Sequence, residues 1–166
     1  MSIRQLTELD AEAYRDLRLE ALQQNADAFA TVFEEELKKS LDYYQKRFKQ
    51  NNVWTFGYFD ENQLVGVVTL IREQAKKLQH RSMIVAMYVT PKIRKNGIGK
   101  QLMQFAIHQA EAIKGLEQIY LAVVTSNTAA IALYQSLDFE IYGTEKRAIK
   151  LDDSTYWDEH RMVLYL

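Results

Sequence analysis

The sequence contains no cysteine, a single proline and only three histidines among its 166 residues. Without cysteine there can be no disulfide bond, thiol nucleophile or zinc site built from thiolates, and this composition suits a reducing compartment. No run of about 18 apolar residues is present, which predicts that no helix crosses a membrane. The N-terminus, Met1-Ser2-Ile3-Arg4-Gln5-Leu6, leads into charged residues and does not resemble an export signal. We therefore expect a cytoplasmic protein.

An excess of charge of either sign is also missing, because 21 lysines and arginines are balanced by 22 acidic residues. Proteins that bind nucleic acid or an anionic membrane through a broad basic surface carry an excess of positive charge. We therefore expect neither nucleic acid nor a membrane among the partners of this protein. The net charge of −1 does not indicate which partner it has.

The length and the 48% share of hydrophobic residues suffice for one domain with a sizeable core. No linker-like segment or internal repeat interrupts the sequence, so we expect residues 1–166 to form a single domain. Local patterns predict the element order β, α, α, β, β, β, α, β, α, β, β. Ser40 could cap a new helix within the second helical region. The expected strands are 2–6, 53–59, 64–72, 82–89, 118–124, 140–151 and 157–166, and the expected helices are 8–24, 34–50 and two that begin near Gly97 and Asn127.

The segment from residue 82 to residue 113 combines a strand, a loop and a helix. Residues 82–89 are mostly apolar or β-branched and are followed by Pro91, the only proline, which predicts a buried strand with a sharp end. Apolar residues then recur at helical spacing from Ile98 onward, which predicts an amphipathic helix that begins near Gly97.

The start of that helix has the features of a phosphate-binding site. The first N–H groups of a helix lack partners within the helix and form the positive end of its dipole. Gly97 and Gly99 would let a ligand approach the backbone closely, and Arg94, Lys95 and Lys100 add positive charge. The pattern predicts a site for a pyrophosphate group. The alternative is a surface turn between a strand and a helix that begins with glycine.

A second segment follows the predicted strand 118–124. Asn127, or Ser126 beside it, can cap a helix in which Ala130 and Tyr134 lie on one apolar stripe. Tyr134 follows Asn127 by seven residues, two turns or about 10 Å along the helix, so both side chains could contact one extended ligand. The alternative for Tyr134 is a core tyrosine whose hydroxyl is bonded to a backbone carbonyl.

Both segments resemble motifs of the GCN5-related N-acetyltransferase (GNAT) superfamily, in particular its small, single-domain, bacterial-type members. Residues 89–102 read Val-x-Pro-x-x-Arg-x-x-Gly-Ile-Gly-x-x-Leu, which resembles the family's acetyl-CoA-binding motif. Residues 127–139 resemble its Asn-x-x-Ala-x-x-Leu-Tyr-x-x-x-Gly-Phe segment, except that Asp138 stands in place of the glycine. We expect Asp138 to adopt the left-handed conformation that Asp tolerates.

The resemblance implies the GNAT acyl-CoA N-acyltransferase fold, in the α+β (α/β) class. This fold has a mixed, mostly antiparallel central sheet of about seven strands flanked by four helices. Its fourth and fifth strands splay apart, and the acyl-pantetheine lies in the opening like an additional strand. By position, Met87 and Val89 would offer their backbone groups to that opening.

The activity implied is direct transfer of an acetyl group from acetyl-CoA, as co-substrate, to an amine acceptor, without a metal. A small-molecule acceptor is preferred, and a protein N-terminus or lysine is the other option. Tyr134 would protonate or hydrogen-bond the departing thiolate, and a homodimer could form through the terminal strands. The residues expected to bind acetyl-CoA are Met87, Tyr88, Val89, Arg94, Lys95, Asn96, Gly97, Ile98, Gly99, Lys100, Asn127, Ala130 and Tyr134. The alternative is a non-catalytic acyl-CoA-binding sensor or interaction module with the same fold.

A general base is harder to identify from the sequence, because residues 82–87 of the fourth strand contain no carboxylate. Glu73, Glu34 and Glu35 are candidates, and His80 is the first to test because an unperturbed imidazole titrates near neutrality. The alternative for His80 is a partly exposed residue at the start of a strand. The run Glu34-Glu35-Glu36 is interpreted as a solvated helix face, and Tyr156 and Trp157 are candidates for the wall of the acceptor pocket.

Overall fold

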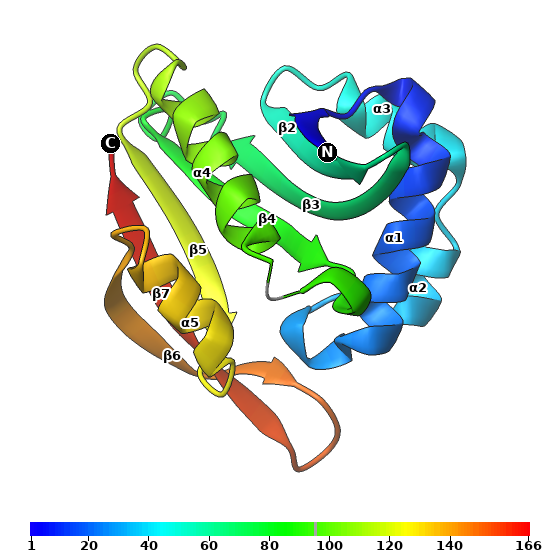
Figure 1. Ribbon diagram of the computed structural model, residues 1–166. Helices are drawn as coiled ribbons and strands as arrows, with labels where there is room; N and C mark the ends of the chain where they lie inside the picture. Colours follow the sequence, from blue (N-terminus) through cyan, green and yellow to red (C-terminus); the bar gives the residue numbers. More distant parts are fainter. Residues whose placement is uncertain (95) are drawn as a thin grey trace.

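The computed structural model describes residues 1–94 and 96–166 and contains one sheet of seven strands in the order β1-β2-β3-β4-β5-β7-β6 (Figure 1). All neighbouring strands are antiparallel except β4 and β5, which are parallel. The strands are β1 (Ser2–Gln5), β2 (Val53–Asp60), β3 (Gln63–Arg72), β4 (Arg81–Val89), β5 (Gln118–Val124), β6 (Glu140–Lys150) and β7 (Tyr156–Tyr165). All seven expected strands are therefore confirmed, with every end within one residue of the expected position.

Five α-helices flank the sheet within the described residues, whereas four were expected. The second expected helical region is divided, because the Ser40 hydroxyl accepts a hydrogen bond from the Tyr43 amide and begins a new helix. The helices are α1 (Ala11–Gln24), α2 (Phe33–Leu37), α3 (Leu41–Phe48), α4 (Ile98–Glu111) and α5 (Thr128–Gln135), with short 3-10 turns η1 (Glu8–Asp10), η2 (Ala26–Ala28) and η3 (Pro91–Ile93).

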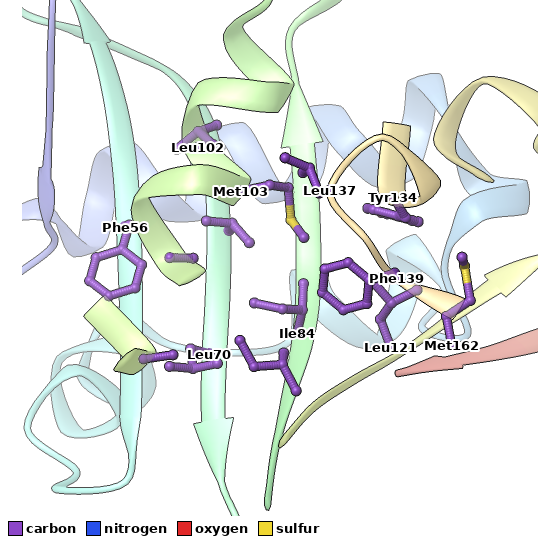
Figure 2. Packing of buried hydrophobic residues seen from close by; sticks show 14 of the residues in the cluster. Phe56, Leu70, Ile84, Leu102, Met103, Leu121, Tyr134, Leu137, Phe139 and Met162 are labelled. Carbon is purple, nitrogen blue, oxygen red and sulfur yellow. The ribbon is translucent and has the colours of Figure 1, made fainter. Parts of the chain in front are cut away.

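The helices divide between the two faces of the sheet because side chains alternate along each strand. Val67 and Tyr88 pack in a cluster with residues of α1 and α3, whereas Val68 and Val89 pack in a larger cluster with residues of α4 and α5. Figure 2 shows the larger cluster, in which Leu102 and Met103 of α4, Tyr134 of α5 and Leu137 just after α5 meet strand residues including Phe56, Leu70, Ile84, Leu121 and Met162. This core places α4 and α5 on the same face of the sheet.

The two parallel strands separate along their length. β4 pairs with β5 only from Arg81 to Met83, whereas β5 stays paired with β7 through Val124. A bulge in β4 accompanies the separation. The pairing with β3 shifts between Val85 and Tyr88, and Ala86 has a φ of 54°, a left-handed conformation that is uncommon for alanine. The sheet therefore opens toward the carboxyl ends of β4 and β5, where η3 and α4 follow β4 and α5 follows β5 (Figure 1).

Candidate functional site

A cleft of about 420 Å³ occupies the opening between β4 and β5. Its lining comes from the second half of β4, from β5, from the first turn of α4, from α5 and from the segment around η2. The residues are Asn25, Ala28, Phe29, Ile84, Val85, Ala86, Met87, Tyr88, Val89, Arg94, Gly97, Ile98, Gly99, Lys100, Leu121, Ala122, Val123, Val124, Asn127, Ala129, Ala130, Leu133 and Tyr134. Residues of both sequence motifs therefore meet at one cleft.

The edge of β4 offers backbone groups to this cleft. The Thr90 amide donates to the Val65 carbonyl of β3 at 2.9 Å. Because successive backbone groups of a strand point to opposite sides, those of Val89 and Met87 point away from β3 and toward the opening. Arg94 Nε donates to the Val89 carbonyl from that side at 2.8 Å. The backbone of Met87 is thus oriented to pair with an extended ligand.

The start of α4 closes one end of the cleft. Gly97 caps the helix with a φ of 74°, a conformation that glycine adopts without steric cost. A Cβ atom at Gly97 would meet only Gln101 Nε2, at 3.9 Å, so the glycine is needed for its backbone conformation rather than for space. Behind it, the amides of Ile98, Gly99 and Lys100 belong to the first helical turn, whose N–H groups lack intrahelical acceptors and attract anions.

The cations near this turn have different roles. Lys100 is exposed and lines the cleft. Arg94 also lines it, but its Nη2 atom donates to Asn25 Oδ1 at 2.6 Å and its guanidinium lies 5.3 Å from the centre of the Tyr88 ring. Arg94 therefore fastens the loop to β4 and to the segment before η2, in addition to placing charge there. Asn96 is exposed and is not among the lining residues, and Lys95 lies outside the described residues.

A second helix contributes polar side chains from the opposite side. Asn127 Oδ1 accepts a hydrogen bond from the Ala130 amide at 3.2 Å and caps α5, as the sequence predicted. Tyr134 lies two turns further along and is 8% exposed at the cleft. Its hydroxyl has no hydrogen-bond partner among the described residues. Burial raises the pKa of Tyr134 to about 12, so the hydroxyl stays protonated at neutral pH and is available to donate to a ligand.

The end of α5 agrees with the expectation for Asp138, which has a φ of 64°. The chain reverses there, and the Phe139 amide donates to the Tyr134 carbonyl at 3.1 Å. Phe139 is buried beside Tyr134, with their ring centres 6.1 Å apart. The left-handed residue therefore lets the chain fold back so that Phe139 supports the tyrosine.

His80 is not brought to the cleft. It precedes the end of β4 that is paired with β5, and its carbonyl accepts hydrogen bonds from the amides of Glu117 and Gln118 at 2.8 and 3.1 Å. Ile84, the first cleft residue on that strand, lies four residues away, about 13 Å in an extended chain. Within the described part of the chain, no histidine or carboxylate lines the cleft. We therefore do not assign His80 a role in the site.

The other candidates for the base and for the acceptor wall also lie outside the cleft lining. Glu34 and Glu35 are exposed on α2, and Glu73 borders a separate surface hollow beside Gln79. Tyr156 and Trp157 begin β7 at the tip of the terminal hairpin, where the guanidinium of Arg147 lies 4.9 Å from the centre of the Tyr156 ring.

Glu36 corrects the interpretation of the acidic run as a solvated face, because it is only 2% exposed. Its carboxylate accepts hydrogen bonds from the Tyr44 hydroxyl at 2.7 Å and from Lys39 Nζ at 2.9 Å. It lines a second cavity, of about 270 Å³, that shares Val85 and Ala86 with the cleft. Sequence reasoning missed this cavity. The only local signal was the i, i+3 spacing of Glu36 and Lys39.

Two other kinds of site find no support. Among residues 1–94 and 96–166, no group of three or more histidine or acidic side chains is arranged to hold a metal ion. No helix in the same residues has the length and apolar character needed to cross a membrane.

Comparisons with known proteins agree with the fold. The family model described as "Acetyltransferase (GNAT) family" matches residues 7–139. A chloroplastic GCN5-related N-acetyltransferase of Arabidopsis thaliana is 37% identical over 73 residues, which are 44% of this chain and only 25% of that relative. The chain therefore spans about a quarter of the length of this curated relative.

Solved structures share the fold at low sequence identity. A GNAT-family acetyltransferase from Streptococcus pneumoniae superposes with a TM-score of 0.85 at 24% identity and covers 99% of both chains. A putative acetyltransferase from Salmonella typhimurium, solved with its cofactor acetyl-CoA, superposes with a TM-score of 0.85 at 18% identity over 100% of this chain and 94% of that one. Since the family model covers most of the sequence, the chain belongs to the acetyltransferase (GNAT) family.

Proposed function

We propose that the protein is an acetyl-CoA-dependent N-acetyltransferase that transfers the acetyl group directly to an amine, with a small molecule preferred over a protein N-terminus or a lysine side chain. The observation that carries this proposal is the cleft between β4 and β5, where the first turn of α4 and the unbonded hydroxyl of Tyr134 meet. The acetyl-CoA complex described for the Salmonella typhimurium relative supports it. We keep the cytoplasm as the predicted location and a homodimer as a predicted assembly.

The lining suits acetyl-CoA in three ways. The first amides of α4, beside Lys100, provide donors and positive charge for the pyrophosphate. The free edge of β4 around Met87 offers backbone groups to an extended pantetheine arm. Leu121, Val123 and Leu133 supply apolar walls for that arm. We propose that the expected residues that line the cleft bind acetyl-CoA, with Arg94 acting chiefly to hold the loop, and we keep Lys95 and Asn96 as proposed binding residues.

Acetyl-CoA would supply the thioester, whose carbonyl carbon forms a bond to the neutral amine as the carbon–sulfur bond breaks. The products are an acetamide and the CoA thiol, because the proton that the nitrogen loses balances the one that the sulfur gains. We propose that backbone donors at the bulge around Ala86 polarise the carbonyl oxygen. Among the described residues, no histidine or carboxylate lines the cleft to act as a general base. We therefore propose that the amine binds neutral, or loses its proton to water.

Tyr134 would act on the departing sulfur. With its pKa raised to about 12 by burial, its hydroxyl is a far weaker acid than a thiol, whose ordinary pKa is about 8.5. Full proton transfer to a thiolate would therefore be uphill, by roughly 5 kcal/mol. A hydrogen bond to the developing negative charge is the role that the environment of this tyrosine favours.

The test is an amine panel assayed with acetyl-CoA, in which released CoA thiol is followed by absorbance and the acetylated product by mass spectrometry. Amine-dependent thiol release with a matching product supports the enzyme. The alternative, a non-catalytic acyl-CoA-binding sensor or interaction module, predicts that acetyl-CoA binds but that no amine is acetylated, and that Tyr134→Phe leaves binding unchanged.

A further inference from the structure

The second cavity lies against the β4 bulge, on the face of the sheet that α1 and α3 cover. It has a volume of about 270 Å³ and includes Val85 and Ala86, which also line the cleft. Phe29 connects the two, because it lines the cleft while the guanidinium of Arg18, in the second cavity, lies 4.7 Å from the centre of its ring. An acceptor in this cavity would therefore be adjacent to the part of β4 where the acetyl group is transferred.

The charges in the cavity do not cancel. Glu36 is its one carboxylate among the described residues, and Lys39 Nζ neutralises it at 2.9 Å. Hydrogen bonds from Tyr44 and Lys39 outweigh the effect of burial and lower the pKa of Glu36, so this carboxylate is ionised at neutral pH. Arg18 and Arg47 also line the cavity. Two positive charges therefore remain after Glu36 and Lys39 are paired.

Both arginine side chains have N–H groups that form no hydrogen bond with the described residues. The Arg18 side chain is only 12% exposed, its Nε atom lies 3.8 Å from Glu36 Oε2, and its Nη1 atom is buried without a hydrogen-bond partner in the described part of the chain. Burying a donor without an acceptor is costly, so an oxyanion bound in the cavity would provide the hydrogen-bond acceptor that Arg18 Nη1 lacks. The side chain of Arg47, from α3, forms no hydrogen bond or ion pair with any described residue.

Resting on the proposed function, we propose that the acceptor is a small amino acid, in which the amine to be acetylated and a carboxylate belong to one molecule. The planar guanidinium groups of Arg18 and Arg47 match the geometry of a carboxylate. A cationic acceptor such as a polyamine would instead meet two uncompensated positive charges. The volume of about 270 Å³ lies just below the usual range for ligand pockets, about 300–1,000 Å³, which suits a compact molecule.

The experiment uses matched pairs of acceptors, each proteinogenic L-amino acid and its carboxamide. Spermidine serves as a cationic acceptor, and short peptides serve as larger molecules that also carry an amine and a carboxylate. Thiol release is measured for the full-length wild type and for Arg47→Gln and Arg18→Gln, and acetyl-CoA binding is measured by calorimetry for each. Lys46→Gln is the matched control, because Lys46 neighbours Arg47, carries the same charge, is paired with Asp42 at 2.6 Å and does not line the cavity.

We expect at least one amino acid to exceed its amide in kcat/KM by about 10-fold or more, and Arg47→Gln to reduce kcat/KM for that acid by about 10- to 100-fold, mainly through KM. Arg47→Gln should leave acetyl-CoA binding unchanged, and Lys46→Gln should leave both quantities unchanged. Because Arg18→Gln also removes a neighbour of Glu36, Arg47→Gln is the decisive variant.

The outcomes separate the two proposals. If amides, peptides or spermidine are acetylated as well as the acids or instead of them, this inference is overturned and the proposed function stands. If acetyl-CoA binds but no amine is acetylated, the inference and the proposed enzymatic activity both fail, and the non-catalytic alternative is supported. If acetyl-CoA does not bind, the proposed function fails and the inference fails with it. An unchanged KM for the acid in Arg47→Gln likewise rejects a role of this cavity in acceptor binding.

Discussion

Replacement of Tyr134 by phenylalanine separates its chemical role from a structural one. The ring packs in the core beside Phe139, but the hydroxyl has no hydrogen-bond partner among the described residues. Removing it should therefore change the free energy of unfolding by less than about 0.5 kcal/mol, whereas removing a bonded hydroxyl and leaving its partner buried costs about 1–3 kcal/mol. If the hydroxyl stabilises the departing thiolate, the lost bond to a charged group is worth about 1.5–3 kcal/mol, or roughly a 10- to 150-fold fall in kcat.

The assay is thiol release with the best amine of the panel, combined with urea denaturation of both proteins. The wild type should also show no loss of activity from Tyr134 ionisation between pH 7 and about 10, because its pKa of about 12 keeps the hydroxyl protonated there. An unchanged kcat in Tyr134→Phe, or a loss of stability that matches the loss of activity, would refute the proposed role.

Three further predictions concern stability and are measured by urea denaturation. Asp138→Gly should raise the free energy of unfolding by about 0.5–1 kcal/mol, because the left-handed backbone at Asp138 suits glycine; a decrease would contradict this. Asp10→Asn should lower it by about 1–2 kcal/mol at pH 7, because hydrogen bonds from Arg4 hold the pKa of Asp10 at about 2, below its ordinary 3.8. Because the pKa of Asp10 is lower in the folded than in the unfolded protein, its carboxylate stabilises the fold above the unfolded pKa, and this stabilisation is lost as the pH falls from about 4 toward 2. The difference in unfolding free energy between wild type and variant should therefore shrink over that range. A constant difference would argue against the ion pair. Leu102→Ala should cost about 2–5 kcal/mol, because Leu102 is fully buried under α4, and a cost below 1 kcal/mol would mean that the core relaxes around it.

Much of the backbone framework around the cleft could be predicted from the sequence because its signals are local. Pro91 marks the end of β4, Gly97 marks the start of α4, and Asn127 caps α5. Each depends on the backbone of a few neighbouring residues. The left-handed conformation at Asp138 could be expected for the same reason, since few residue types tolerate it.

The second cavity, where we propose that the acceptor binds, could not be predicted in this way. Arg18, Glu36, Arg47 and Val85 come from α1, α2, α3 and β4, and their proximity depends on how three helices pack on the sheet. The acidic run gave no sign that Glu36 would be buried while its neighbours stay exposed, because α2 is only five residues long. His80 was attractive for its chemistry, yet it lies at the end of β4 that stays paired with β5.

The most direct test of the account is calorimetric titration of acetyl-CoA into the wild type and into Gly97→Glu and Gly97→Gln. Both substitutions place a side chain of the same size where a Cβ atom meets nothing closer than 3.9 Å, and both carry the same backbone cost at a φ of 74°. Only the glutamate puts a negative charge beside the expected pyrophosphate, which should cost about 2–4 kcal/mol of binding free energy. The account predicts binding by the wild type and an affinity roughly 30- to 900-fold lower for Gly97→Glu than for Gly97→Gln. Equal affinities in the two variants, or no binding by the wild type, would contradict it.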